Sequence, residues 1–161
     1  MPELTAAVLT VSDASSRGLR QDLSGPAVKQ VLEQHGFAVV AADVVADEQG
    51  EIEQALVRLC AMARLVVTTG GTGLGPRDVT PEATRAVAGR LVQGISERMR
   101  MEGARRVPTA ILSRGVCAAR GSSLIVNLPG SPSGATESIM VVIEVLPHAL
   151  ELLAGKTSHK Q

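Results

Sequence analysis

The segment from Thr68 to Glu82 carries the residues best suited to chemistry in this chain of 161 residues. Four glycines fall within the six positions of Gly70-Gly71-Thr72-Gly73-Leu74-Gly75, so several backbone N–H groups can approach an anion closely. A tight turn would account for one or two of these glycines, but not for four followed by Arg77-Asp78. The segment is not a Walker P-loop, because Pro76 stands where that pattern needs Lys, and it lacks the GxGxxG spacing. We therefore expect this loop to contact the phosphates of a nucleotide or a related ligand.

Two acidic residues are candidates for holding Mg2+ against those phosphates. Asp78 lies in the glycine-rich loop, and Asp47 follows a strand expected at the same edge of the sheet. Mg2+ usually binds one or two carboxylates together with substrate phosphates. The alternatives are a solvated turn residue for Asp78 and a helix cap for Asp47, and a cap is compatible with a metal role. Asp13 and Asp22 flank a further polar loop, where capping or turn formation is the more usual role.

Other polar groups lie near the ends of later apolar runs. Ser113-Arg114 and Arg120-Gly121 place guanidinium groups beside small residues, and the planar fork of Arg suits an anionic ligand. A solvated surface Arg is the more common explanation from sequence alone. Asn127 ends an apolar strand, where its side-chain amide could contact a base or a pterin edge, although turn-forming Asn residues are equally common.

The composition narrows the class of protein. The length suits one domain, and 45% hydrophobic with 20% charged residues indicates a globular chain. Sixteen basic and sixteen acidic side chains cancel, and Phe37 is the single aromatic residue. These counts argue against nucleic-acid binding, which needs a basic surface and, for single strands, aromatic platforms. Cys60 and Cys117 form no CxxC pair, and the histidines are far apart along the chain, at His35, His148 and His159.

Several features of the chain predict a cytoplasmic protein. No apolar run approaches the ~20 residues that span a bilayer, and Met1-Pro2-Glu3-Leu4 does not resemble an export signal. The two cysteines are interpreted as buried free thiols in a reducing compartment. We therefore expect neither a membrane nor a nucleic acid among the partners.

The elements that must position these residues alternate between strand-like and helix-like patterns. This alternation predicts one α/β domain with a mostly parallel sheet. Strands are expected at 6–11, 37–45, 65–69 and 122–128. Helices are expected to begin near Ser24, Asp47 and Thr80, with a weaker pattern over 95–105 and a last helix over 139–153 kinked at Pro147. The polar loops 12–23, 70–80 and 127–134 follow strands, so they should meet where ligands bind in open α/β sheets.

The motifs together resemble the molybdenum cofactor biosynthesis family of MogA and MoaB type, over about residues 5–153. The resemblance rests on Thr68–Glu82, Ser12-Asp13, Asp22-Leu23-Ser24-Gly25, Asp47-Glu48, Ser113-Arg114 and Asn127-Leu128-Pro129-Gly130-Ser131-Pro132. It implies a single domain over 1–161 with a three-layer α/β/α fold and a molybdopterin-binding site. Active members of this family use Mg-ATP to adenylylate molybdopterin and release pyrophosphate.

The resemblance also implies roles by position. Asp78 and Asp47 would be the catalytic carboxylates and would hold Mg2+. The nucleotide and its phosphates would lie against Gly70, Gly71, Thr72, Gly73, Glu82, Ser12 and Asp13. Molybdopterin would face Ser113, Arg114, Asn127, Pro129, Gly130 and Ser131. The terminal phosphate of molybdopterin would be the nucleophile, so a protein nucleophile is not needed.

Two alternatives to an active adenylyltransferase stay open. One is a MoaB-like paralogue that binds molybdopterin or nucleotide with little activity, and the other is a non-catalytic scaffold in cofactor assembly. The presence of both Asp47 and Asp78 favours activity. The resemblance further implies a homotrimer, or a hexamer as among MoaB-like members, and a molybdate-insertion enzyme as a downstream partner.

Overall fold

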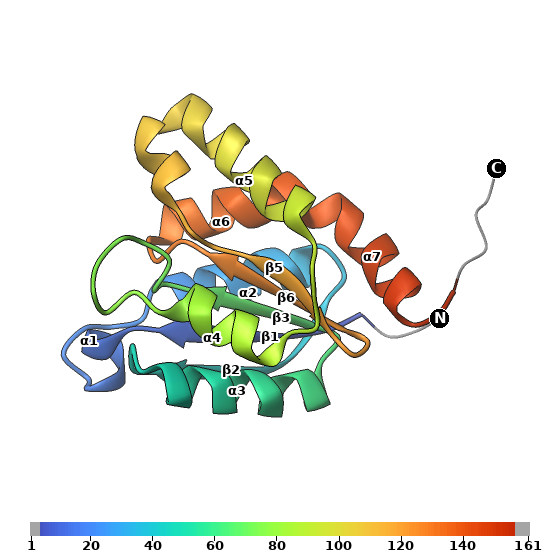
Figure 1. Ribbon diagram of the computed structural model, residues 1–161, viewed down its shortest axis with the longest axis horizontal. Helices are drawn as coiled ribbons and strands as arrows, with labels where there is room; N and C mark the ends of the chain where they lie inside the picture. The colour runs from blue at the N-terminus through green and yellow to red at the C-terminus, as the bar shows by residue number, and fades with distance from the viewer. Residues whose placement is uncertain (1–3, 157–161) are drawn as a thin grey trace.

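Six strands form one sheet in the computed structural model, which describes residues 4–156 (Figure 1). Their spatial order is β2-β1-β3-β6-β5-β4. The strands span Thr5–Val11 (β1), Ala38–Val45 (β2), Leu65–Thr69 (β3), Arg90–Leu91 (β4), Cys117–Arg120 (β5) and Ser123–Leu128 (β6). β2, β1, β3 and β6 run parallel, whereas β5 is antiparallel to β6 and β4 is antiparallel to β5. The predicted mostly parallel sheet is confirmed.

Helices cover both faces of this sheet and produce three α/β/α layers, as expected (Figure 1). The helices span Asp13–Ser16 (α1), Ser24–Gln34 (α2), Gln49–Met62 (α3), Thr80–Val87 (α4), Gln93–Arg106 (α5), Pro132–Val142 (α6) and Leu146–Leu153 (α7). Two 3-10 turns add Pro108–Leu112 (η1) and Ile143–Val145 (η2). α3 and α4 pack on one face, and α2, α5, α6 and α7 pack on the other.

Two hydrophobic cores lie on opposite faces of the central strands because successive side chains of a strand point to opposite sides. In β1, Ala6 and Val8 belong to the core under α2, α5, α6 and α7, while Ala7 and Leu9 belong to the core under α3 and α4. All five residues of β3 are buried. Double burial explains why these strands appear in the sequence as continuous apolar runs.

The carboxyl-terminal part of the chain differs from the prediction of one kinked helix. α6 ends at Val142, and α7 begins at Leu146 after the η2 turn. Pro147 lies in the first turn of α7, where its missing N–H has no intrahelical partner to lose. The proline therefore starts a new helix instead of bending a continuous one.

Two helices begin at the predicted residues, whereas the cap predicted at Asp47 is corrected. Ser24 and Thr80 lie inside the first turns of α2 and α4, and Glu48 takes the N-cap position of α3 in place of Asp47. The side chain of Asp22 accepts the Gly25 N–H at the start of α2. The polar side chains expected to cap helices instead connect one loop to another.

The loop predicted over 12–23 contains the short helix α1, which Ser12 caps by accepting the Ser15 N–H. No helix within residues 4–156 is long and apolar enough to cross a membrane. His159 lies outside the described residues, as do Met1 to Glu3 of the segment that was not expected to be an export signal.

Candidate active site

Four parallel strands end at one edge of the sheet, as the sequence predicts, and the loops that follow them begin there. Thr10 is in register with Thr69, and Thr69 is in register with Leu128, so β1, β3 and β6 end at the same level. Val11 pairs with Val45 at the end of β2. The register therefore brings the segments that begin at 12, 46, 70 and 129 together.

The glycine-rich loop adopts a conformation that requires two of its glycines. Gly70 has φ +94° and Gly71 has φ +70°, in the left-handed region that other residues rarely occupy. A side chain on Gly70 would overlap with the carbonyl oxygen of Val11, and one on Gly71 would overlap with the Thr80 hydroxyl. The loop consequently turns sharply at the end of β3 and lies directly against the end of β1.

The Asp78 carboxylate lies inside this loop. Its Oδ2 atom accepts the Gly75 N–H at 2.9 Å, and the Asp78 N–H donates to the Gly75 carbonyl at 3.0 Å. Side chains at Gly73 and Gly75 would approach Oδ2 to 2.9 and 2.8 Å. The two glycines therefore leave the space that the carboxylate occupies.

Asp47 and Asp13 join the loops that follow β2 and β1. The Asp13 N–H donates to Asp47 Oδ2 at 2.9 Å, and the Asp47 N–H donates to Asp13 Oδ1 at 3.0 Å. Arg77 then reaches from the glycine-rich loop to both Asp13 oxygens, at 3.0 and 2.9 Å, and to Glu48 at 2.9 Å. These contacts hold three of the loops together.

The electrostatics of this group differ between its two aspartates. Hydrogen bonds from the Arg77 guanidinium, and then from the Asp47 N–H, hold the pKa of Asp13 below its ordinary value. Burial raises the pKa of Asp47, and the negative charges of Asp13 and Asp78 act in the same direction. Asp47 is thus a half-buried carboxylate next to other acidic groups, an environment that a cation would stabilise.

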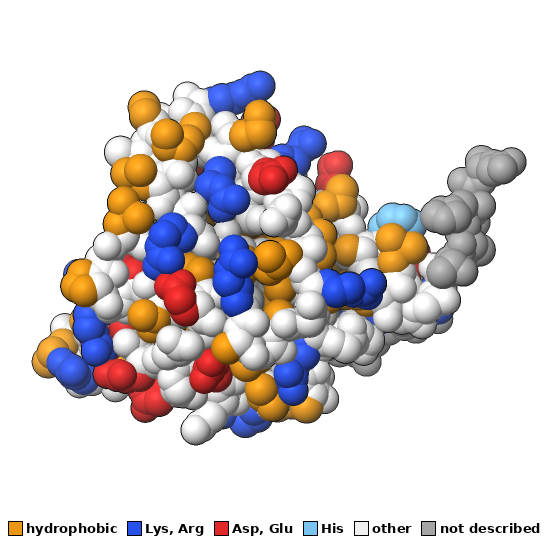
Figure 2. All heavy atoms as spheres, viewed as in Figure 1, with side chains coloured by type: hydrophobic (Ala, Val, Ile, Leu, Met, Phe, Trp, Pro, Cys, Tyr) orange, Lys and Arg blue, Asp and Glu red, His pale blue; other side chains and the backbone are white. Residues whose placement is uncertain are grey.

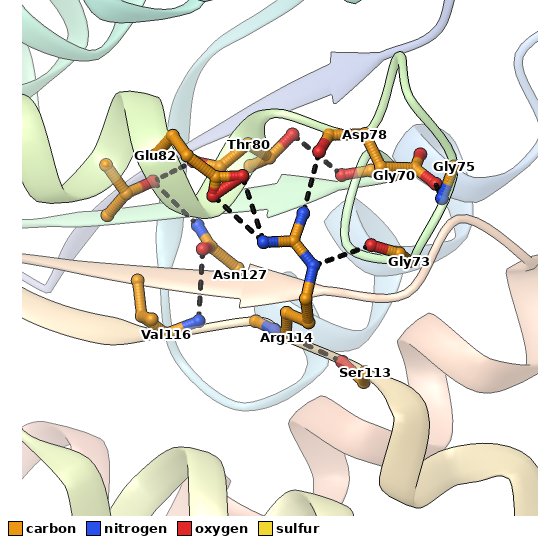
Figure 3. A network of polar contacts seen from close by, with 12 residues as sticks. Gly70, Gly73, Gly75, Asp78, Thr80, Glu82, Ser113, Arg114, Val116 and Asn127 are labelled. Atoms are coloured by element: carbon orange, nitrogen blue, oxygen red, sulfur yellow. Dashed lines mark hydrogen bonds and ion pairs between the residues drawn. The ribbon is translucent and has the colours of Figure 1, made fainter.

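Arg114 takes a position that the sequence does not reveal (Figure 3). Its Nε donates to the Gly73 carbonyl at 2.8 Å, and its Nη2 donates to the Asp78 carbonyl at 2.7 Å. Its Nη1 lies 3.0 Å from both carboxylate oxygens of Glu82. The guanidinium expected to face molybdopterin is therefore directed at the glycine-rich loop, together with Glu82.

A cavity of about 330 Å³ lies between α5, η1, α6, the segment before β5 and the end of β6. This volume lies in the range of small-molecule sites. Four of the residues predicted to face molybdopterin line this cavity: Ser113, Asn127, Pro129 and Ser131. Gly130 serves a different purpose, because it packs against the backbone of Gly70, where a side chain would come within 3.3 Å of the Gly70 Cα.

Three charged residues that line the cavity were missed by sequence reasoning. Arg100 and Arg106 of α5 and Glu137 of α6 line it, and Arg106 pairs with Glu137 at 3.3 Å. The only signal in the sequence was the concentration of arginines in 98–106, on a helix whose pattern was weak. Arg120, also considered as an anion ligand, instead donates to the Val87 carbonyl at 2.7 Å, where α4 ends.

Asn127 is 2% exposed, and its amide is engaged within the protein (Figure 3). Its Oδ1 accepts the Val116 N–H at 3.1 Å. Its Nδ2 donates both hydrogens, to the hydroxyl groups of Thr68 at 3.1 Å and Thr84 at 3.0 Å. The amide therefore ties β6 to β3, to the start of β5 and to α4, and has no N–H left for a pterin.

The fold and the site define a three-layer α/β/α domain in which Arg114 connects a glycine-rich loop that carries Asp78 to a cavity of small-molecule size. Comparison with known proteins identifies the family to which this domain belongs. The family described as a probable molybdopterin binding domain matches residues 7–148. The chain belongs to this family, and the resemblance drawn from its motifs is confirmed.

Individual relatives agree with this assignment. The chain is 42% identical to the molybdopterin adenylyltransferase of Helicobacter pylori strain J99, over 96% of this chain and 90% of the relative. It is 38% identical to the molybdopterin adenylyltransferase of Escherichia coli K12, over 96% and 88%. The crystal structure of the molybdopterin biosynthesis enzyme MoaB from Thermus thermophilus superposes with a TM-score of 0.88 at 51% identity, covering 95% of this chain and 98% of that one.

Proposed function

We propose that this chain is a molybdopterin adenylyltransferase that uses Mg-ATP. The observation that carries the proposal is the link between the cavity and the glycine-rich loop: Ser113 and Gly115 line the cavity, and Arg114 between them donates to the Gly73 and Asp78 carbonyls of the loop. Two polyanionic substrates must be held together in this reaction, and such transfers depend mainly on positioning and charge stabilisation. The names of the relatives support the same activity.

In the proposed reaction, a terminal phosphate oxygen of molybdopterin attacks the α-phosphorus of ATP. A new P–O bond forms, and the bond from the α-phosphorus to the α,β-bridging oxygen breaks. Pyrophosphate leaves with that electron pair, and AMP stays attached to molybdopterin. The backbone N–H groups of the segment 71–73 would bind the ATP phosphates, while the Gly70 N–H donates to the Leu128 carbonyl at 3.1 Å. The organic part of molybdopterin would occupy the cavity. Ser12 and Asp13 lie at the end of β1, next to this segment.

The residues present fit a Mg2+ ion. Asp47 and Asp78 come from different loops, and the charge of Asp78 contributes to the raised pKa of Asp47. Both carboxylates lie against the glycine-rich loop, since a side chain on Gly71 would come within 3.3 Å of Asp47 Oδ1 and one on Gly73 within 2.9 Å of Asp78 Oδ2. This donor set agrees with an ion whose remaining ligands are substrate phosphates and water. When bound, Mg2+ would neutralise phosphate charge and orient the α-phosphate.

We also propose that the domain works as a homo-oligomer, a trimer or hexamer, in the cytoplasm. Hydrophobic side chains gather on the surface over α5 and η1 (Figure 2), and the exposed ones are Met101, Val107, Ile111 and Leu112. An apolar surface of this kind is typical of a protein interface. The adenylylated product would pass to a molybdate-insertion enzyme. Sedimentation of the purified chain tests the oligomeric state, and a monomer at micromolar concentration would contradict it.

A second candidate function is that of a weakly active MoaB-like protein. The 51% identity to the Thermus structure named MoaB is the observation that keeps this candidate open. Such a protein would bind molybdopterin or nucleotide with little turnover. Measurement of product, and not of binding alone, separates the two candidates.

The decisive experiment is anaerobic incubation with Mg-ATP, with and without molybdopterin, followed by measurement of pyrophosphate and adenylylated product. We expect pyrophosphate only when molybdopterin is present, and loss of turnover in Asp78→Asn. A matched control is Asp43→Asn, because Asp43 pairs with Arg58 on the surface. Saturable molybdopterin binding without product would favour the MoaB-like function, and neither binding nor product would reject both.

A further inference from the structure

The segment 113–115 takes part in two sites at once. Ser113 and Gly115 line the cavity, while Arg114 between them is directed at the glycine-rich loop. Arg100 of α5 holds this segment from the cavity side, because its Nη1 donates to the Gly115 carbonyl at 2.8 Å and lies 3.4 Å from the Ser113 carbonyl. The position of Arg114 is thus fixed by residues of the cavity wall.

The contacts of Arg114 close the glycine-rich loop across its width. The Arg114 N–H donates to the Thr72 carbonyl at 2.8 Å, and the guanidinium binds the Gly73 and Asp78 carbonyls. These acceptors come from both limbs of the loop, so a single side chain sets the distance between them (Figure 3). The carbonyl of Asp78 belongs to the residue whose carboxylate we assign to Mg2+.

Glu82 completes the arrangement from the first turn of α4. Its two carboxylate oxygens accept from the same Arg114 nitrogen, at 3.0 Å each. The pair compensates the Arg114 charge and fixes the rotation of its planar fork. Lys carries a single point charge and cannot reach three partners in these directions at once.

We infer that Arg114 is a positioning residue, which through Glu82 and the loop carbonyls sets the location of Asp78 without touching molybdopterin. This inference rests on the proposed function and departs from the expectation that Arg114 faces molybdopterin. It predicts that a change in the cavity wall alters the conformation of the glycine-rich loop through segment 113–115. A displacement of about 1 Å in a reacting group costs on the order of 100-fold in rate.

The test separates positioning from direct contact. We expect Arg114→Gln to lower kcat/KM for ATP about 100-fold, while the dissociation constant for molybdopterin, measured without ATP, changes less than about 3-fold. Arg114→Lys should fail to restore turnover, and Glu82→Gln should show the same pattern. The double variant should be no worse than Arg114→Gln alone, because both substitutions remove one arrangement.

Hydrogen exchange supplies a readout that does not need turnover. Amides of 72–79 should exchange faster in Arg114→Gln, whereas those of β3 and β6 should be unchanged. The matched control is Arg120→Gln, because Arg120 also donates to a backbone carbonyl, that of Val87. This control should leave both loop exchange and the KM for ATP unaltered.

Two results would overturn the inference. One is a large loss of molybdopterin affinity in Arg114→Gln with normal exchange over 72–79, which would mean that Arg114 contacts the pterin substrate. The other is full rescue by Arg114→Lys, which would mean that only its charge matters. If the wild-type chain forms no product, the proposed function fails, and exchange over 72–79 by itself then decides whether Arg114 holds the loop.

Discussion

Replacing Asn127 by Ala removes the side chain that joins three strands and a helix at the edge of the site. The substitution leaves the Val116 N–H without its acceptor inside the core. It also removes two hydrogen bonds, to the hydroxyl groups of Thr68 and Thr84. Both threonines are fully buried. We therefore expect a loss of stability first, and a loss of ligand binding as its consequence.

The magnitude follows from these three contacts. An unsatisfied buried N–H costs about 1–3 kcal/mol, and each lost neutral hydrogen bond costs about 1 kcal/mol. The free energy of unfolding should therefore fall by about 4 kcal/mol, a large part of the ~5–15 kcal/mol that stabilises a typical domain. With a urea dependence of about 2 kcal/mol per molar, the unfolding midpoint should fall by about 2 M.

Urea unfolding followed by far-ultraviolet circular dichroism measures this change, since the chain contains neither Trp nor Tyr for fluorescence. Ser138→Ala is the control, because Ser138 also lines the cavity, on α6. Its free energy of unfolding should change by less than about 0.5 kcal/mol. Our reasoning is refuted if Asn127→Ala loses under about 1 kcal/mol of stability but loses molybdopterin binding completely, because the amide would then serve the ligand.

Three further perturbations test other parts of the site. Gly71→Ala should destabilise the fold by at least about 1 kcal/mol, because Gly71 has φ +70° and the new methyl group would overlap with the Thr80 hydroxyl. A urea unfolding midpoint equal to that of the wild type would contradict this geometry. Arg77→Gln should raise the pKa of Asp13 toward its ordinary value, measured by NMR titration. The stability that Arg77 provides through Asp13 should be present above about pH 4 and lost as the pH falls through the lowered Asp13 pKa. Burial raises the pKa of Cys117 to about 12, so a disulfide reagent at pH 8 should modify this thiol only after unfolding.

Much of the fold was readable from the sequence because local patterns determine it. β1, β3 and β6 are continuous apolar runs, and the turn at Gly70-Gly71 needs residues that accept positive φ. β4 and β5 were missed because they contain two and four residues, too few to show a period. Their antiparallel pairing depends on β6 and not on any pattern of their own.

The sequence by itself determined the loops that meet at the site, since parallel strands end at a common edge and polar, glycine-bearing segments follow them. Only the tertiary structure decided where each polar side chain points. The Arg114 side chain points to the glycine-rich loop and not to the cavity, and that of Asn127 points into the core. Asp47 binds Asp13 instead of capping α3. Arg114 and the Asp78 carbonyl are 36 residues apart in the chain, Asn127 and Thr68 are 59 apart, and Asp47 and Asp13 are 34 apart. Hydrogen bonds over such separations depend on the packing of the sheet and its helices, which no local pattern encodes.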